Sequence, residues 1–259
     1  MKTKFFTAML AVATAYCTGC GKSNPGETGN DIPVSVKERV TALNLSVNGL
    51  YRTDGGYVAE QDIFLSDELL NSAAQTTHYL GAHQEHYRTV NLVTGLPRTI
   101  SIRYTGATAS ISNAINAAIA RYNAQALQIR FQRVTTGGNI VISNVSGVAY
   151  NAVSGFPSGG NPYGAIMVNT AVSAWPAGSI TTLIAHELGH CIGFGHTDVV
   201  DNFSCGGVSP GPSPITYIHI FGTPTLGSGD PNSWMMRCLS AGIDRPFTVI
   251  DRQALNIIY

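Results

Sequence analysis

Three histidines and a glutamate lie close together in residues 186–196, in the pattern His-Glu-x-x-His-x-x-Gly-x-x-His. On a helix, the four-residue spacing of His186 and His190 places both imidazoles on one face, where both can bind a single metal ion. Gly193 lies where such a helix must end and turn back, so that His196 can supply a third nitrogen. Three protein ligands and one exchangeable position are typical of a catalytic zinc site, whereas a structural site usually has four protein ligands.

Glu187 directly follows the first of these histidines. A carboxylate beside a zinc ligand can face the open side of the metal and take a proton from an attacking water. We therefore expect a zinc-dependent endopeptidase with one catalytic Zn²⁺. Two alternatives stay open: a zinc hydrolase of a non-peptide amide or ester, and a catalytically silent surface protein that uses the same scaffold as a binding module. The intact Glu187 argues against the second alternative, since a binding protein needs no base.

The first two histidines must lie on a helix, and the surrounding sequence predicts one. Apolar residues recur at helical spacing before and within the motif, at Ile180, Leu183, Ile184 and Leu188. Ser179 has the hydroxyl of a typical N-cap, so we expect the helix to begin there.

The chain before this helix alternates between strand and helix patterns. Residues 107–127 are rich in alanine and carry isoleucines on one side, which predicts an amphipathic helix. Residues 147–153 predict a short edge strand. Further strands are predicted at residues 99–104, 128–134, 139–144 and 164–168. This order of elements favours an α+β domain.

The N-terminus has the pattern of an export signal. Lys2 and Lys4 precede a short apolar run, residues 5–15, which is too short to span a bilayer. The run leads to Cys17-Thr18-Gly19-Cys20, which resembles a bacterial lipoprotein cleavage box and makes Cys20 the lipidated residue. The alternative is an ordinary secretory signal that is cut nearby. We expect an exported protein, either lipid-anchored to a bacterial membrane (outer membrane or cell surface) or secreted.

We divide the chain into four parts. These are a lipoprotein signal peptide (residues 1–19), a flexible tether (20–32), a leading segment that a precursor could lose (33–90) and a catalytic domain (91–259). Within the leading segment, residues 34–46 predict a helix and residues 66–70 predict a capped helix start.

Charge and cysteine content limit the partners. The formal net charge is zero and 12% of the residues are charged, with no basic block, so we expect no nucleic acid. We expect protein or peptide substrates and a monomeric protein. Pairing Cys205 with Cys238 would close the long loop after the metal motif, and a pair with Cys191 is the main alternative. Calcium in the loop 198–230 also stays open, although no liganding pattern is recognisable there.

The motif that ends in Gly193 and His196 resembles that of the metzincin zinc peptidases. That group also has a methionine-containing turn beneath the metal, and the stretch 232–238 is similar to it. The resemblance assigns Met235 to the turn, with Met236 as the alternative. The match is closer to the dual-action HEIGH metallopeptidases and covers residues 87–259. It is supported by residues 91–98, 155–157, 186–198, 221–224 and 251–259.

This resemblance implies a zincin-like metallopeptidase domain with a twisted mixed sheet, an active-site helix and a Met-turn. It also implies a cleft along the edge strand, where a substrate peptide would add a further strand. Some related metzincins carry a tyrosine after the turn methionine that assists oxyanion stabilisation, but Arg237 or Cys238 stands there in this chain. Tyr217 is the substitute that we consider. Asp198 would either orient a metal ligand or cap the following loop.

The stretch Glu60-Gln61-Asp62-Ile63 resembles the Glu-Gly-Asp-Ile piece with which astacin-type propeptides place an aspartate on the zinc. Gln61 replaces the glycine. The resemblance implies that Asp62 caps the zinc in a latent form of the protein and displaces the water. The alternative is that Asp62 is an ordinary acidic residue at the end of a strand.

Overall fold

The centre of the protein is a mixed five-stranded sheet with the strand order β6-β5-β7-β9-β8. The structure is a computed structural model that describes residues 32–43, 45–72, 86–199, 203–205, 217–224 and 230–259. The strands are β5 (Arg98–Tyr104), β6 (Ile129–Val134), β7 (Ile140–Val145), β8 (Ala152–Val153) and β9 (Ala165–Asn169). Neighbouring strands are parallel except that β8 runs antiparallel to β9. The expected mixed sheet is confirmed, and β8 forms its edge within the predicted residues 147–153.

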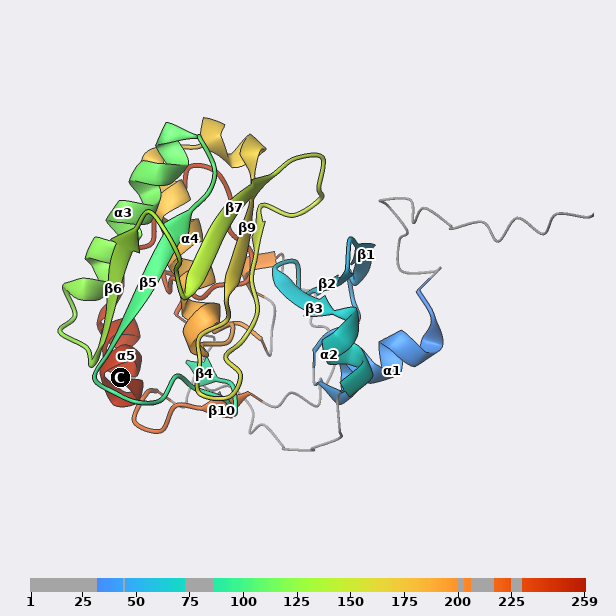
Figure 1. Cartoon of the computed structure of the whole chain (residues 1–259). Coiled ribbons are helices and arrows are strands. Elements are labelled where there is room, and N and C mark those ends of the chain that lie inside the picture. The colour runs from blue at the N-terminus through green and yellow to red at the C-terminus, as the bar shows by residue number, and fades with distance from the viewer. Residues whose placement is uncertain (1–31, 44, 73–85, 200–202, 206–216, 225–229) are drawn as a thin grey trace, which may run out of the picture.

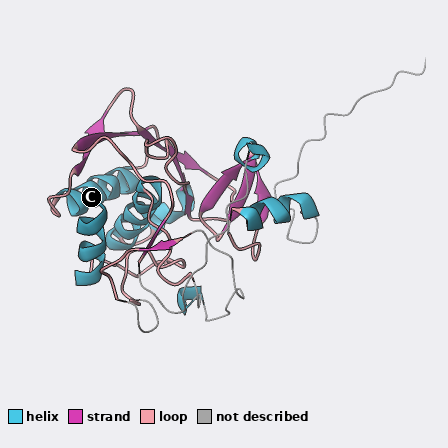
Figure 2. Ribbon diagram, turned by 90° about the horizontal axis from the view of Figure 1, so that it is seen from below, coloured by secondary structure: helices cyan, strands magenta, loops and turns pink. Residues whose placement is uncertain are grey.

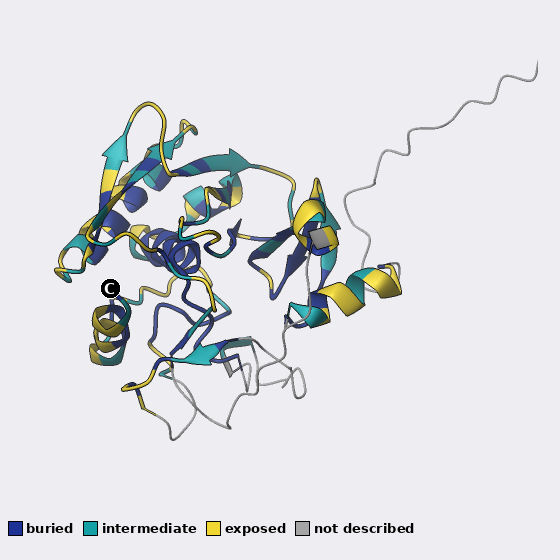
Figure 3. Ribbon diagram, turned by 60° about the horizontal axis from the view of Figure 1, so that its bottom comes forward, coloured by how far each residue is buried: buried dark blue, intermediate teal, exposed yellow. Residues whose placement is uncertain are grey.

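Two helices cover one face of this sheet (Figure 1). Helix α3 (Ala109–Asn123) buries Ile111, Ile115, Ala118 and Ile119, the stripe that the sequence predicts. The second is α4 (Ala177–Ile192), which packs along α3 and is buried for most of its length (Figure 3). Tyr122 joins the two helices, because its hydroxyl donates to the Ala185 carbonyl over 2.8 Å.

Helix α4 begins earlier than the sequence indicates. Pro176 is its N-cap, so the prediction of Ser179 as N-cap is wrong. Proline needs no hydrogen-bond donor at a helix start, and its fixed φ suits that place. Ser179 is buried within the helix, where its hydroxyl accepts a hydrogen bond from the Gly242 amide at 3.0 Å. The helix ends at Gly193, whose φ of 109° is left-handed, as expected.

The leading segment folds as a small sheet with two helices beside the larger sheet (Figures 1 and 2). Its elements are α1 (Val34–Ala42), β1 (Tyr51–Thr53), β2 (Gly56–Ala59), β3 (Ile63–Ser66) and α2 (Asp67–Ser72). The three strands are antiparallel in the order β1-β2-β3. Helix α1 is shorter than predicted, and the capped start of α2 is found, since the Ser66 hydroxyl accepts from the Leu69 amide at 3.0 Å. This part has its own apolar core, to which Val199 and Tyr217 contribute from the other side.

The leading segment extends the larger sheet at its edge. Ile63 forms a parallel bridge with Ser154, the residue after β8. The Phe64 amide donates to the Ser154 carbonyl at 2.7 Å, and the Ser154 amide donates to the Asp62 carbonyl at 3.0 Å. Residues 62–64 therefore lie where a strand added to this edge would lie.

The remaining elements hold the chain around the end of α4. They are β4 (Tyr87–Arg88), the 3-10 helices η1 (Thr170–Ala174) and η2 (Phe203–Cys205), β10 (Ile218–His219) and the C-terminal helix α5 (Val249–Ile258). Strand β4 pairs with β10, and the Tyr87 carbonyl accepts from the Gly195 amide at 2.9 Å. Among the described residues, none of the helices is both long and apolar enough to cross a membrane.

Candidate active site

The end of α4 brings the three histidines of the motif together. Their ring centroids are 4.5 Å apart for His186 and His190, 4.8 Å for His190 and His196, and 5.2 Å for His186 and His196. The left-handed Gly193 lets the chain turn so that His196 faces the helix. A Cβ at this glycine would lie 2.8 Å from the Leu92 side chain and 2.9 Å from the Asn91 carbonyl, so the turn also depends on the missing side chain.

Backbone carbonyls fix the orientation of two of the rings. His186 Nδ1 lies 2.8 Å from the Trp234 carbonyl oxygen, and His190 Nδ1 lies 2.8 Å from the Phe194 carbonyl oxygen. A carbonyl oxygen can only accept a hydrogen bond, so both Nδ1 atoms carry the proton. In the neutral rings, each Nε2 then presents a lone pair to the centre of the site, which is the form that binds a metal.

The carboxylate of Asp62 joins the histidines. Its Oδ2 lies 3.1 Å from His186 Nε2 and 3.0 Å from His196 Nε2, and its Oδ1 lies 3.9 Å from His190 Nε2. The four residues each offer one ligand atom, all within 4.8 Å of one another, and all four are buried.

The donor set suits a metal ion. Two ligands about 2.0–2.1 Å from one zinc ion are roughly 3.3–3.4 Å apart, close to the separations of Asp62 from His186 and His196. His190 Nε2 and Asp62 Oδ1 are buried without a hydrogen-bond partner among the described residues. Buried polar atoms of this kind are costly unless they coordinate an ion. These residues therefore form a group that could hold a metal, consistent with zinc.

A second carboxylate orients the third histidine. Glu60 Oε2 lies 3.2 Å from His196 Nδ1 and 3.2 Å from Arg237 Nη2, and Glu60 Oε1 accepts from the Ser46 amide at 3.1 Å. Glu60 and Gln61 both have positive φ, 53° and 79°, which turns the chain so that Glu60 and Asp62 reach the histidines together. The sequence does not predict this role for Glu60, and its only signal is that Glu60 lies two residues before Asp62.

Burial and neighbouring charges shift the pKa values of the residues in the site. Burial alone would lower the pKa of His196, but Asp62 and Glu60 outweigh it and raise that pKa to about 9. Burial alone would raise the pKa of Asp62, but the three histidines outweigh it and lower that pKa. Burial, and after it the neighbouring His186, lower the pKa of His190 to about 4.

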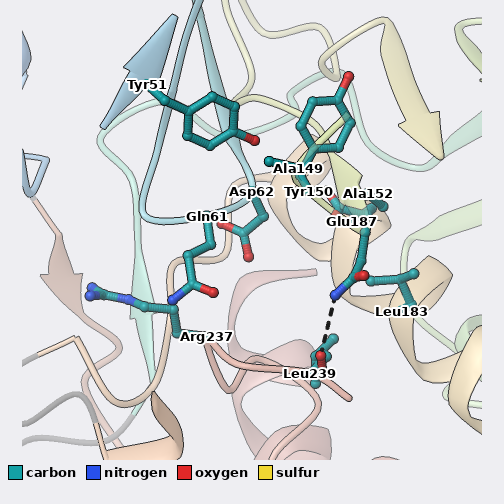
Figure 4. Close-up of a pocket in the computed structure, with 11 residues that line it drawn as sticks. Tyr51, Gln61, Asp62, Ala149, Tyr150, Ala152, Leu183, Glu187, Arg237 and Leu239 are labelled. Atoms are coloured by element: carbon teal, nitrogen blue, oxygen red, sulfur yellow. Dashed lines mark hydrogen bonds between the residues drawn. The ribbon is translucent and has the colours of Figure 1, made fainter. Parts of the chain in front are cut away.

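Glu187 lies beside this group and faces a small cavity. The cavity has a volume of about 110 Å³ and is also lined by Asp62, Tyr51, Tyr150 and Arg237. Figure 4 shows Asp62 between Glu187 on one side and Gln61 and Arg237 on the other. Both carboxyl oxygens of Glu187 are buried and have no hydrogen-bond partner among the described residues. Burial, together with the charge of Asp62, raises the pKa of Glu187.

The turn that carries Met235 lies under the histidines. A Cβ on Gly189, between the first two histidines, would lie 2.5 Å from the Met235 sulfur, so this thioether packs directly against the helix backbone. Trp234, in the same turn, supplies the carbonyl that orients His186, and its indole donates to the Tyr122 hydroxyl at 3.1 Å. Met236 is also buried, but the three atoms nearest to this Cβ position on Gly189 belong to Met235, Trp234 and Tyr122.

Cys205 and Cys238 form a disulfide. Its sulfur atoms contact the leading segment, because Gln61 Nε2 lies 3.1 Å from Cys238 Sγ and 3.5 Å from Cys205 Sγ. Cys191, the alternative partner, is buried and free.

Other predicted residues have structural roles or lie outside the described part. Asp198 caps the following loop, since it accepts hydrogen bonds from the Ser204 amide and hydroxyl and from the Arg237 amide. Tyr217 packs in the core of the leading segment and does not line the cavity at Glu187. Cys20 lies outside the described residues, as do residues 206–216 of the loop where calcium stayed open.

The comparison with protein families agrees with the motif. The family model described as dual-action HEIGH metallo-peptidase matches residues 57–259. Among solved structures, two of myroilysin align with TM-scores of 0.44 each, at 14% and 15% identity. They cover 65% and 66% of this chain, and 82% and 86% of their own. No curated protein matches the chain.

Proposed function

The chain belongs to the dual-action HEIGH metallopeptidase family, and from that membership we propose that it is a metzincin-type zinc endopeptidase, seen here in a latent form. Membership of a peptidase family makes proteins or peptides its substrates. One observation supports zinc catalysis above all. The three histidines point their Nε2 atoms at one buried point, and backbone carbonyl oxygens hold the Nδ1 atoms of His186 and His190.

The proposed chemistry divides between the ion and the protein. When bound, zinc lowers the pKa of a coordinated water to about 7 and polarises the scissile carbonyl. Glu187 accepts the proton of the attacking water and delivers it to the leaving amine. Burial in a small cavity suits this role, because it keeps bulk water away from the transferred proton.

The edge of the sheet supplies the substrate-binding strand. Ser154 has its amide and carbonyl engaged by the leading segment, at Asp62 and Phe64. A substrate peptide would replace these contacts with its own backbone groups, which gives affinity with little dependence on sequence. The leading segment and the substrate therefore compete for the same strand position at the edge of the sheet.

Latency follows from the same contacts. With Asp62 among the three imidazoles, the fourth ligand position belongs to the protein, and no position remains for water. We therefore assign Asp62 as the latency switch. We also keep the expectation of export with a lipid on Cys20, which rests on the N-terminal sequence.

The test uses the full chain with Asp62→Ala, in which the fourth position is open. Metal content and cleavage of a peptide library are measured with and without the further change Glu187→Gln. We expect equal zinc content in both, and a fall in kcat/KM of about 10²–10⁴-fold when Glu187 is changed. Bound zinc without cleavage of any peptide would favour a binding module, and turnover of esters alone would favour a non-peptide hydrolase.

A further inference from the structure

A buried cation lies next to the metal cluster, and among the described residues a carboxylate of the leading segment forms an ion pair with it. Arg237 directly follows the methionine turn and is 6% exposed. Its Nη2 is 3.2 Å from Glu60 Oε2, and Glu60 itself is 1% exposed. Burial alone would lower the pKa of Arg237, but Glu60 and Asp198 outweigh it and keep the guanidinium charged.

The carboxylate of Glu60 must leave whenever a substrate enters. Glu60 lies two residues before Asp62, whose carbonyl accepts the Ser154 amide at the sheet edge. A peptide that takes over this edge displaces the stretch and removes the carboxylate between Arg237 and His196. The nearby Asp198 cannot easily replace it, because both its carboxylate oxygens already accept other hydrogen bonds, from Ser204 and from the Arg237 amide.

The latent chain reaches this position in an unusual conformation. Glu60 and Gln61 are consecutive residues with positive φ, a region that side-chain-bearing residues seldom adopt. This conformation persists where surrounding contacts over-determine it. The contacts that do so here are the Glu60 ion pair, the Asp62 contacts with the histidines, and Gln61 against the Cys238 sulfur.

We propose that Arg237 forms a specificity subsite that binds an Asp or Glu side chain of the substrate beside the scissile bond, and that Glu60 fills this subsite in the latent chain. The planar guanidinium fork matches a carboxylate, and a charged pair of this kind discriminates strongly against a neutral amide. The proposal rests on the peptidase function proposed above and adds a substrate class to it: peptides with an acidic residue next to the cut.

The first test is a peptide library cleaved by the full chain with Glu60→Gln and Asp62→Ala. We expect acidic residues to be enriched at one position beside the scissile bond, and kcat/KM to favour Glu over Gln there by about 10- to 100-fold. Adding Arg237→Met should abolish this ratio while cleavage of the Gln peptide continues. Arg245→Met is the matched control, since this partly exposed arginine lies nearby and should leave the ratio unchanged. If Arg237→Met does not fold, Arg237→Lys keeps the charge, loses the fork and should lower the ratio several-fold.

The second test detects carboxylate binding at Arg237 without measuring cleavage. Glu60→Ala opens a cavity beside Arg237, so acetate should raise the Tm of this full-length variant compared with chloride at equal ionic strength. Glu60→Gln, which leaves no cavity, and the double variant Glu60→Ala with Arg237→Met should show no such rise.

The outcomes separate the two proposals. No acidic preference, or a preference that survives Arg237→Met, overturns the subsite. Equal Tm in acetate and chloride for Glu60→Ala overturns it as well. Acetate stabilisation together with no cleavage of any peptide refutes the peptidase function, and with it the assignment of a substrate class, whereas cleavage without acidic preference refutes the subsite alone.

Discussion

Replacing Asp62 with alanine should convert the latent chain into an active one. The side chain of Asp62 is 10% exposed, and its Oδ2 lies 3.1 Å and 3.0 Å from the imidazoles of His186 and His196. Alanine removes both contacts and frees the fourth ligand position. It leaves the backbone contacts at Ser154 and the Glu60 ion pair in place, so the leading segment should still occupy the cleft for part of the time.

The expected gain follows from these contacts. With zinc bound, the Nε2 atoms face the ion and the Asp62 carboxylate pairs with the charge of the ion; losing one partner of a buried charged pair costs about 3–5 kcal/mol. We take a combined loss of about 3 kcal/mol for the bound segment. At 1.4 kcal/mol per tenfold, the fraction of chains with an open cleft should rise about 100-fold.

The measurement is the initial rate of cleavage of a quenched fluorescent peptide by full-length Asp62→Ala and by the unchanged chain, both loaded with zinc. Asp54→Ala is the control, since Asp54 is an exposed acidic residue in the turn between β1 and β2 and should not change the rate. Zinc affinity is measured in parallel and should weaken in Asp62→Ala, because a ligand is lost. A precursor that stays silent while zinc affinity is unchanged would refute the assignment of Asp62.

Three further results are expected. Removing metal with a chelator should destabilise the unchanged chain and lower its Tm. The loss in free energy of unfolding grows with zinc concentration and is about 2.7 kcal/mol at 100 times Kd, and an unchanged Tm would argue against a bound ion. Cys205→Ser with Cys238→Ser removes a disulfide between residues 33 apart and should lower the free energy of unfolding, measured in urea, by about 3–4 kcal/mol. A loss below about 1 kcal/mol would mean that other contacts hold the loop. Gly193→Ala should destabilise the protein by about 1–3 kcal/mol and lower zinc affinity, because φ is 109° and the Asn91 carbonyl leaves no room for a Cβ; Gly242→Ala, also at positive φ but with open space around it, is the control that should keep zinc affinity.

Local patterns explain which parts of the fold the sequence predicts. The spacing of His186 and His190 and the glycine at residue 193 depend on helix geometry within a few residues, so the metal-site helix and its end are predicted correctly. The start of that helix is not, because Ser179 is engaged by Gly242, a residue 63 positions away along the chain. A cap is a local signal, and a tertiary contact overrides it here.

The residues around the metal group show the same limit. Asp62 is found only through a resemblance, and its neighbour Glu60 has no signal of its own in the sequence. Both reach His196 across more than 130 residues, and no local pattern reports such a contact. The role of Arg237, which stands where some related metzincins carry a tyrosine, is not predicted for the same reason. Its burial, which rules out an ordinary surface residue, becomes visible only when the small sheet packs against the methionine turn.

The strand added at Ser154 belongs to the same chain as the cleft that it fills. An inhibitor tied covalently to its target acts at an effective local concentration on the order of millimolar, whatever the amount of protein in solution. One backbone cut between the leading segment and the catalytic domain would make the binding of that segment a bimolecular equilibrium. Dilution alone would then empty the cleft without a change in any contact. Because a hydrolysed peptide bond does not re-form, such an activation would run in one direction only.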